Sequence, residues 1–173
     1  MTFRTRLVAL LGIAVAAIAA GTVVGATPAF AFSGVEYVNN GSAKCVTADA
    51  AGVGVVQWTC SRADNQGWTV IGATANGNPF QIQSTLTGRC LDITSFSNAA
   101  PVVQVDCAGQ PTGSYWKFVR AGNREFPFVN LLIIQSAFFN YCLDLENGDR
   151  SDGVPMQVWQ CNSRTNNQIW YAL

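Results

Sequence analysis

From about residue 32 onward, short stretches of the chain alternate apolar with polar residues. Examples are FQIQS (Phe80–Ser84), WKFV (Trp116–Val119), QVW (Gln157–Trp159) and NQIWYAL (Asn167–Leu173). Such alternation, with many β-branched and aromatic residues, predicts short β-strands that bury one face. Clusters of Gly, Asn, Asp, Ser and Pro, such as TANGNP, SFSNAAP and ENGDRSDG, separate the stretches and predict turns. No amphipathic helical period occurs there, so the pattern predicts an all-β fold.

The first thirty-one residues follow a different pattern. Two arginines precede an uncharged apolar run from Leu7 to about Ala20, and a stretch of small residues then ends in Ala29–Ala31. This order is typical of a secretory signal peptide. We therefore predict a signal peptide at 1–31 and a secreted, extracellular protein that starts at Phe32 or a few residues to either side. A retained membrane anchor is the alternative, but two glycines interrupt the run and a cleavage motif ends it. No later segment is apolar enough to span a membrane.

The remaining chain repeats itself three times. SAKCVTA, GRCLDI and NYCLDL surround one set of cysteines, and VVQWTC, VVQVDC and MQVWQC end in a second set. The three cysteine pairs have internal spacings of 15, 17 and 19 residues. A tryptophan follows each pair, namely Trp68, Trp116 and Trp170, at intervals of 48 and 54 residues. We therefore predict one domain at 32–173, with repeats of about 35–79, 80–127 and 128–173.

A repeat of this kind cannot bury its own apolar face, so the three units must share one core. Three copies of a short-strand unit that close on themselves predict a β-trefoil, a threefold barrel with capping hairpins. A propeller needs about four blades or more and fits three units poorly. The equivalent tryptophans, one per unit, are then expected to fill the shared interior.

All six cysteines lie in the predicted secreted part. An even number of cysteines in an exported chain indicates disulfides. Six cysteines allow fifteen pairings, but the repeat favours one bond within each unit, worth about 3 kcal/mol in the chain-entropy model. The predicted disulfides are Cys45–Cys60, Cys90–Cys107 and Cys142–Cys161.

Composition narrows the chemistry further. The chain has no histidine, which excludes every Ser-His, Cys-His and His-metal arrangement. Ten Lys and Arg balance ten Asp and Glu without a basic patch, so nucleic acid and anionic membrane surfaces are not expected partners. The acidic loop Asp144–Gly153 lacks EF-hand spacing. Its acids cluster in one loop rather than forming an opposed pair, so we expect no glycosidase, no metal and no cofactor.

Three units of the pattern Cys-Leu-Asp, Gln-x-Trp-x-Cys and Asn-Gln-x-Trp resemble the ricin B-chain type of lectin domain, also called carbohydrate-binding module family 13. The resemblance covers about Val35 to Leu173 and extends to its secreted, single-domain bacterial members. It implies a non-catalytic sugar pocket in each repeat, built from an acid, a glutamine, a stacking aromatic and an asparagine. In the third repeat every position is filled, with a supporting glutamine beside the asparagine: Asp144, Gln157, Trp159, Asn167 and Gln168.

The other two repeats depart from that pattern. The second keeps Asp92, but has valines at the glutamine and aromatic positions and Gly-Ser in place of Asn-Gln, so we expect no site there. The first keeps Trp58, Asn65 and Gln66, but has a threonine at the acid position and a valine at the glutamine position. Asp49, two residues further on, could replace the acid only if the loop bends differently. We therefore expect a degenerate site in the first repeat.

The predicted chemistry is recognition. An indole packs on the apolar face of a pyranose, while a carboxylate and amides bond its hydroxyls. We expect a secreted lectin that binds a galactose- or xylan-type glycan or polysaccharide, alone or beside separate hydrolases. The alternatives are that Trp159 is a packing residue and that Asp144 caps a turn.

The apolar insert REFPFVNLLIIQSAFF (124–139) suggests another function, that of an inhibitor or toxin subunit. Its IIQS matches the strand QIQS of the second repeat, and the excess is expected to join the core. A protein-binding patch or an oligomer contact remains the alternative for it.

Overall fold

The computed structural model describes residues 34–109, 112–121 and 130–173. The predicted signal peptide and residues 124–129 of the insert lie outside this part. Four short 3-10 helices and no α-helix accompany its strands: η1 Asp64–Gln66, η2 Thr112–Ser114, η3 Glu146–Gly148 and η4 Asn166–Gln168. The strands are β1 Tyr37–Asn39, β2 Cys45–Ala48, β3 Val55–Trp58, β4 Trp68–Ile71, β5 Gln81–Ser84, β6 Cys90–Ile93, β7 Ala100–Val105, β8 Trp116–Arg120, β9 Leu132–Ser136, β10 Tyr141–Leu145, β11 Met156–Gln160 and β12 Trp170–Ala172.

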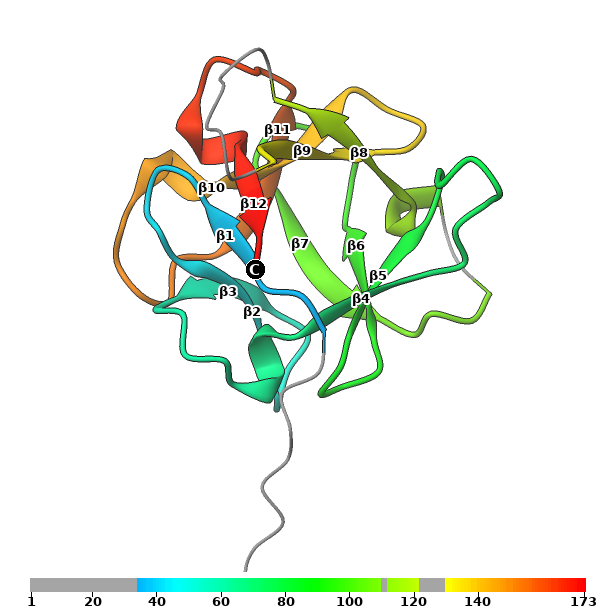
Figure 1. Ribbon diagram of the computed structural model, residues 1–173, viewed down its shortest axis with the longest axis horizontal. Coiled ribbons are helices and arrows are strands. Elements are labelled where there is room, and N and C mark those ends of the chain that lie inside the picture. Colours follow the sequence, from blue (N-terminus) through cyan, green and yellow to red (C-terminus); the bar gives the residue numbers. More distant parts are fainter. Residues whose placement is uncertain (1–33, 110–111, 122–129) are drawn as a thin grey trace, which may run out of the picture. The chain divides into compact units, whose positions relative to one another are not determined.

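Each repeat contributes four strands: β1–β4, β5–β8 and β9–β12. The second and third strands of each repeat form an antiparallel hairpin, and the first strand of the third repeat pairs with both β8 and β12. Strand β1 pairs with β12, so the first repeat is joined to the third. In Figure 1 the blue-to-cyan, green and yellow-to-red strands surround a common centre. The predicted all-β trefoil is confirmed.

The three equivalent tryptophans form the centre of the core. Trp68, Trp116 and Trp170 are fully buried. Each indole N–H donates to the carbonyl of the residue that follows the first cysteine of its repeat, at 2.9, 3.1 and 3.2 Å for Val46, Leu91 and Leu143. A buried indole needs such an acceptor. The recurrence of one bond in three units explains why the Cys and Trp phrases repeat together, and it confirms the predicted core role.

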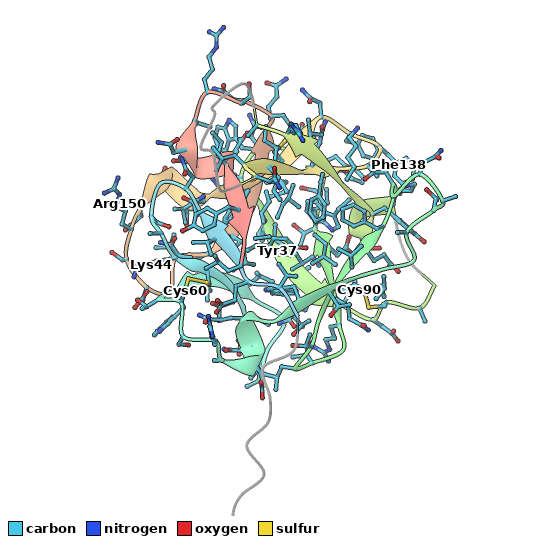
Figure 2. The ribbon with its side chains drawn as sticks, in the orientation of Figure 1. Tyr37, Lys44, Cys60, Cys90, Phe138 and Arg150 are labelled. Atoms are coloured by element: carbon cyan, nitrogen blue, oxygen red, sulfur yellow. A yellow bond between two sulfur atoms is a disulfide. The ribbon has the colours of Figure 1, made fainter. Side chains whose placement is uncertain are left out.

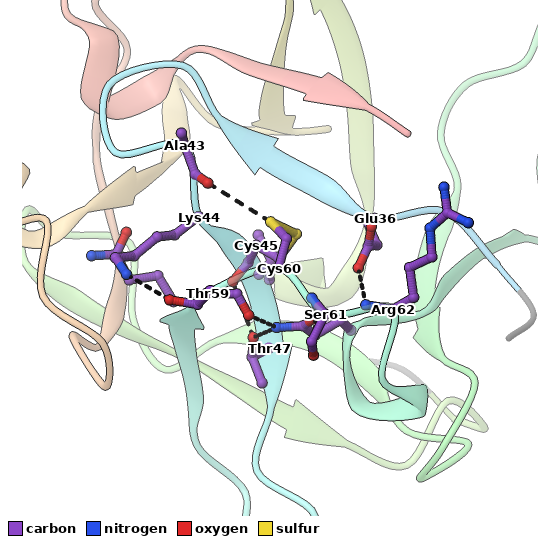
Figure 3. The surroundings of a disulfide bond; sticks show 12 residues. Glu36, Ala43, Lys44, Cys45, Thr47, Thr59, Cys60, Ser61 and Arg62 are labelled. Atoms are coloured by element: carbon purple, nitrogen blue, oxygen red, sulfur yellow. Dashed lines mark hydrogen bonds between the residues drawn. A yellow bond between two sulfur atoms is a disulfide. The ribbon is translucent and has the colours of Figure 1, made fainter.

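The structure contains the three predicted disulfides, Cys45–Cys60, Cys90–Cys107 and Cys142–Cys161. Their Cα atoms are 5.0–5.1 Å apart. Each bond links a cysteine at the beginning of the hairpin's first strand to a cysteine one or two residues after its second strand, and Figure 3 shows the bond of the first repeat. The hairpin that carries each candidate pocket is therefore closed by a covalent bond.

Loops cross from one repeat to the next and are held by buried glutamines. The fully buried Gln57 donates its side-chain amide to the carbonyls of Asp149 and Ser151 in the third repeat, at 2.6 and 2.7 Å. Gln104 of the second repeat donates in the same way to two carbonyls of the first-repeat loop, at 3.0 and 3.1 Å. An ion pair of 2.6 Å between Lys44 and Asp152 adds to the junction of the first and third repeats. Buried amides thus fix loops that contribute to the pockets.

The described part of the apolar insert divides between core and surface. Strand β9 corresponds to β5, as predicted, and buries Ile133 and Ile134. In the following turn Phe138 and Phe139 remain 56% and 39% exposed. Phe139 packs on Phe96 of the second repeat, with ring centroids 3.8 Å apart. Figure 2 shows Phe138 at the periphery of the domain. The strand prediction for IIQS is therefore confirmed. In the described part of the excess, Leu131 is buried as expected, whereas the two phenyl rings are not.

Candidate functional site

The β10–β11 hairpin places the predicted third-repeat residues on one face. Asp144 lies opposite Gln157, and Cys142 lies opposite Trp159. Because successive side chains of a strand point to opposite faces, the residues between them, such as Leu143 and Val158, point into the core. Alternation within two short strands is therefore enough to collect an acid, an amide and an indole on the outer side of the hairpin.

Two glutamine amides hold the Asp144 carboxylate. Oδ1 accepts a hydrogen bond from Gln157 Nε2, and Oδ2 accepts one from Gln168 Nε2, both at 2.9 Å. Gln168 is itself fixed, because its Nε2 also donates to the Gln160 carbonyl at 3.3 Å and its Oε1 accepts from the Asn162 N–H at 2.7 Å. Burial raises the pKa of Asp144, and the two amide donors partly offset that effect. Amide donors thus orient both oxygens of the carboxylate, and no cationic side chain among the described residues takes part.

These groups lie in a pocket of about 270 Å³. Its lining contains a single charged side chain, and Trp159 beside it is 42% exposed. Trp159 is therefore not part of the core, and Asp144 accepts from two side-chain amides. Both observations favour the site prediction over the alternatives of a packing indole and a turn-capping acid. The pocket brings together all five predicted residues, Asp144, Gln157, Trp159, Asn167 and Gln168. Three further lining residues were not indicated by the sequence, namely Asn147, Asn162 and Thr165.

A tight turn closes one end of the pocket. Asn147 and Gly148 both have positive φ, at 53° and 65°. A Cβ atom on Gly148 would lie only 2.8 Å from Asn167 Oδ1, so only glycine lets the turn approach the asparagine this closely. The Asn-Gly dipeptide, which favours left-handed backbone, was the sequence signal for this turn. The positions of Asn162 and Thr165 depend on loop geometry that no motif encodes.

The second repeat keeps the acid without its partners. Asp92 lies opposite Val103, and a valine also occupies the aromatic position. Gly113 replaces the asparagine, and a Cβ there would lie 2.4 Å from Asp92 Oδ1. Within the described residues this oxygen has no hydrogen-bond partner, and burial raises the pKa of Asp92. Asp92 is about as buried as Asp144, at 7% against 5% exposed, so the two acids differ in their partners and not in burial. Asp92 has neither the two amide donors nor the neighbouring aromatic of Asp144, and that no site exists in this repeat stays a prediction.

The first repeat forms a different pocket of about 540 Å³. Thr47 lies opposite Val56, as Asp144 lies opposite Gln157, and Trp58 is 48% exposed. Asp49 lies beyond the end of β2, where its Oδ1 accepts from the Ala51 N–H at 3.0 Å. It caps its own loop and does not take the position of the missing acid. The predicted residues Trp58, Asn65 and Gln66 all line this pocket, but without a carboxylate at its floor.

No group of three or more Cys, Asp or Glu side chains in 34–109, 112–121 and 130–173 is placed to hold a metal ion. Over the same ranges no helix has the length and apolar character needed to cross a membrane.

The sequence and the fold were compared with known proteins. The family model described as "Ricin-type beta-trefoil lectin domain" matches residues 33–170. The Macrolepiota procera ricin B-like lectin, solved in complex with lactose, has a TM-score of 0.67 and 23% identity over 81% of this chain and 95% of that chain. The Rhizoctonia solani agglutinin has a TM-score of 0.65 and 21% identity over 82% and 94%.

An exo-β-1,3-galactanase from Clostridium thermocellum has a TM-score of 0.69 and 24% identity over 82% of this chain but 30% of that chain. At these identities the solved structures show a shared fold, and the last one shows that this fold also occurs within an enzyme. The chain matches none of the curated proteins with which it was compared.

Proposed function

Because the chain belongs to the ricin-type β-trefoil lectin family, we propose that it is a secreted carbohydrate-binding protein whose intact site is the third-repeat pocket. The observation that carries this proposal is the Asp144 carboxylate, held by two glutamine amides beside the exposed Trp159. Family membership supports carbohydrate binding, while the choice of site rests on these residues. Secretion rests on the signal-peptide pattern of residues 1–31.

The pocket has the chemistry that a pyranose requires. Each Asp144 oxygen accepts one amide hydrogen and retains a second acceptor direction for a sugar hydroxyl. Trp159 offers an apolar, electron-rich face for the C–H groups of the ring. Asn167 provides an amide that both donates and accepts. Two vicinal hydroxyls can thus bond the carboxylate while the opposite side of the sugar stacks on the indole.

Galactose-type glycans are the first ligands to test, because a structurally similar lectin was solved with lactose. Xylan-type glycans are the second class. We propose that the protein is not an enzyme, because the usual glycosidase uses two carboxyl groups and this pocket is lined by one. A single shallow site gives a dissociation constant on the order of millimolar to tens of micromolar, so useful avidity would need several copies or clustered ligands.

The experiment is a glycan and polysaccharide binding screen of the disulfide-bonded protein, with Trp159→Ala and Trp58→Ala run in parallel. Both variants remove one exposed indole at the same position of the repeat, so each controls for the other. We expect the wild type and Trp58→Ala to bind a galactose- or xylan-type glycan and Trp159→Ala to lose that binding. Equal binding by Trp159→Ala would refute the third-repeat site.

One observation favours a second candidate function, that of a protein-binding trefoil. In the turn after β9 the exposed Phe139 packs on Phe96, and the exposed Phe138 beside it in the chain packs edge-on against Tyr115. Exposed apolar groups of this kind occur at protein contacts. If folded wild-type protein retains no glycan in the screen, a protein partner at these rings, or an oligomer contact there, becomes the leading proposal.

A further inference from the structure

The first-repeat pocket occupies the same place in its repeat as the third-repeat pocket but presents different chemistry. It is about twice as large, at 540 against 270 Å³, and lacks a carboxylate at its floor. We propose that this pocket binds a small uncharged aromatic ring and has lost the recognition of sugar hydroxyls. The proposal does not depend on whether the third pocket binds a glycan.

The polar groups at the floor of the pocket already bond to one another. Thr47 Oγ1 donates to the Cys45 carbonyl at 3.0 Å and accepts from Gln66 Nε2 at 3.2 Å. Gln66 Nε2 also donates to the Thr59 carbonyl at 3.0 Å, and its Oε1 accepts from the Ser61 N–H at 2.8 Å. Figure 3 shows Thr47, Thr59 and Ser61 of this group beside the first disulfide. Asp49, the one charged acceptor in the lining, lies beyond the end of β2 and accepts from its own loop, so no carboxylate takes the place that Asp144 has in the third pocket. A sugar placed as in the third pocket would leave a pair of hydroxyls without a charged acceptor.

The walls are apolar where those of the third pocket are polar. Val56 stands at the position of Gln157, and three alanines, Ala48, Ala50 and Ala63, also line the pocket. The face of Trp58 is available for stacking, since the side chain is 48% exposed. Offset stacking of a flat ring on an indole between methyl groups is the arrangement that such a lining favours. The volume lies in the range of pockets that hold small molecules.

The charge of the pocket lining disfavours anionic aromatic compounds. The pocket lining contains the carboxylate of Asp49 and no lysine or arginine. An anionic ring would therefore meet a like charge without a cation to balance it. One oxygen of the Asp49 carboxylate already accepts from the Ala51 N–H at 3.0 Å, which makes the group a weaker partner for a cationic ligand. An uncharged ring fits the lining best.

The third repeat completes this pocket. Gly153 lies so close that a Cβ atom on it would be 3.4 Å from Trp58 Cζ3. The loop that carries Gly153 is fixed to the first repeat, since the Gly153 N–H donates to the Gln57 carbonyl at 2.9 Å and the Gln57 amide holds Asp149 and Ser151. The wall is thus in place before a ligand arrives, and little ordering opposes binding.

The test is a fluorescence titration with N-phenyl-1-naphthylamine, an uncharged probe that brightens in an apolar site. We expect the full disulfide-bonded protein to bind it saturably with one site per chain. Trp58→Ala should weaken binding at least about tenfold, since it removes the stacking face. The double variant Thr47→Asp with Val56→Gln, which copies the third-repeat pattern, should weaken it by a similar factor because it places a charge in the apolar pocket.

Two further variants separate this site from the rest of the surface. Trp159→Ala and Phe138→Ser should leave the probe affinity unchanged, because they lie in the third pocket and in the exposed phenyl group. Loss of binding in either variant would place the probe elsewhere and overturn the proposal. Absence of saturable binding by the wild type would also overturn it, as would a sugar that Trp159→Ala retains and Trp58→Ala loses. Circular dichroism of every variant confirms that each one folds.

Discussion

Replacement of Asp144 by asparagine tests the proposed sugar site with the smallest change of shape. The substitution removes the negative charge and turns one oxygen into an NH₂ group. Gln168 cannot turn its amide over, because its Nε2 also donates to Gln160 and its Oε1 accepts from Asn162. Gln157, whose amide bonds only Asp144 among the described residues, can turn over and accept from the new NH₂ group. The local structure should therefore survive.

The loss of affinity follows from the hydrogen bonds. A bond to a charged group contributes about 1.5–3 kcal/mol and a neutral one about 0.5–1.5, so each sugar hydroxyl loses about 1–1.5 kcal/mol. Two hydroxyls on the carboxylate give about 2–3 kcal/mol, or a roughly 30- to 150-fold weaker Kd. Stability at neutral pH should not fall, because burial already disfavours this charge and raises the pKa of Asp144.

The assay is a calorimetric or NMR titration with the glycan that the screen identifies, accompanied by thermal unfolding. The matched control is Asp92→Asn, the same substitution at the equivalent position of the second repeat, and it should leave sugar affinity unchanged. An Asp144→Asn protein that binds within about threefold of the wild type would refute the role of the carboxylate. A variant that loses both binding and several degrees of Tm would instead indicate a structural role.

Two further predictions concern the same pocket. Gly148→Ala places a Cβ atom at 2.8 Å from Asn167 Oδ1 and should weaken sugar binding about tenfold at a stability cost of about 1–2 kcal/mol. Gly153→Ala, also at positive φ but outside this pocket, should lower stability in denaturant titrations without affecting sugar affinity. Acidification should weaken sugar binding as pH falls through the raised pKa of Asp144, the only titratable group in the lining. The fold should persist at that pH by circular dichroism, because the raised pKa of Asp144 favours the folded state at low pH and this contribution is lost as pH rises. Unfolding at the same pH as the loss of binding would contradict the prediction.

The sequence predicts the fold well because each structural requirement recurs three times. The indole of every unit bonds the carbonyl next to the first cysteine, so Cys and Trp stay at corresponding positions. The strand register follows from alternation, which places the acid position opposite the glutamine position in each hairpin. The resemblance assigned Asp144 and Gln157 to one pocket and Thr47 and Val56 to the corresponding positions of the first repeat, and the strand register places each pair opposite each other.

Contacts between repeats could not be predicted in this way. The amide of Gln57 reaches Asp149 across 92 residues of sequence, and Gly153 forms a wall beside Trp58. These contacts depend on how neighbouring units turn around the barrel, which no local pattern encodes. The same reason explains why Asn147 was not recognised as a lining residue of the third pocket. The Asn-Gly dipeptide predicted the turn, but the sequence did not show that the turn lines the pocket.

The pairing of β1 with β12 has a consequence for the order in which the domain folds. Tyr37 pairs with Ala172, and the Glu36 and Leu173 backbones exchange two hydrogen bonds at 3.2 and 3.0 Å. Open solenoid repeats can fold from any point and propagate, but here the opening strand of the first repeat has no complete set of partners until the third repeat exists. Such non-local pairing gives a high contact order and slow, concerted folding. The three repeats should therefore acquire their pockets together, and an isolated third repeat should bind no sugar even though it contains every residue of the site.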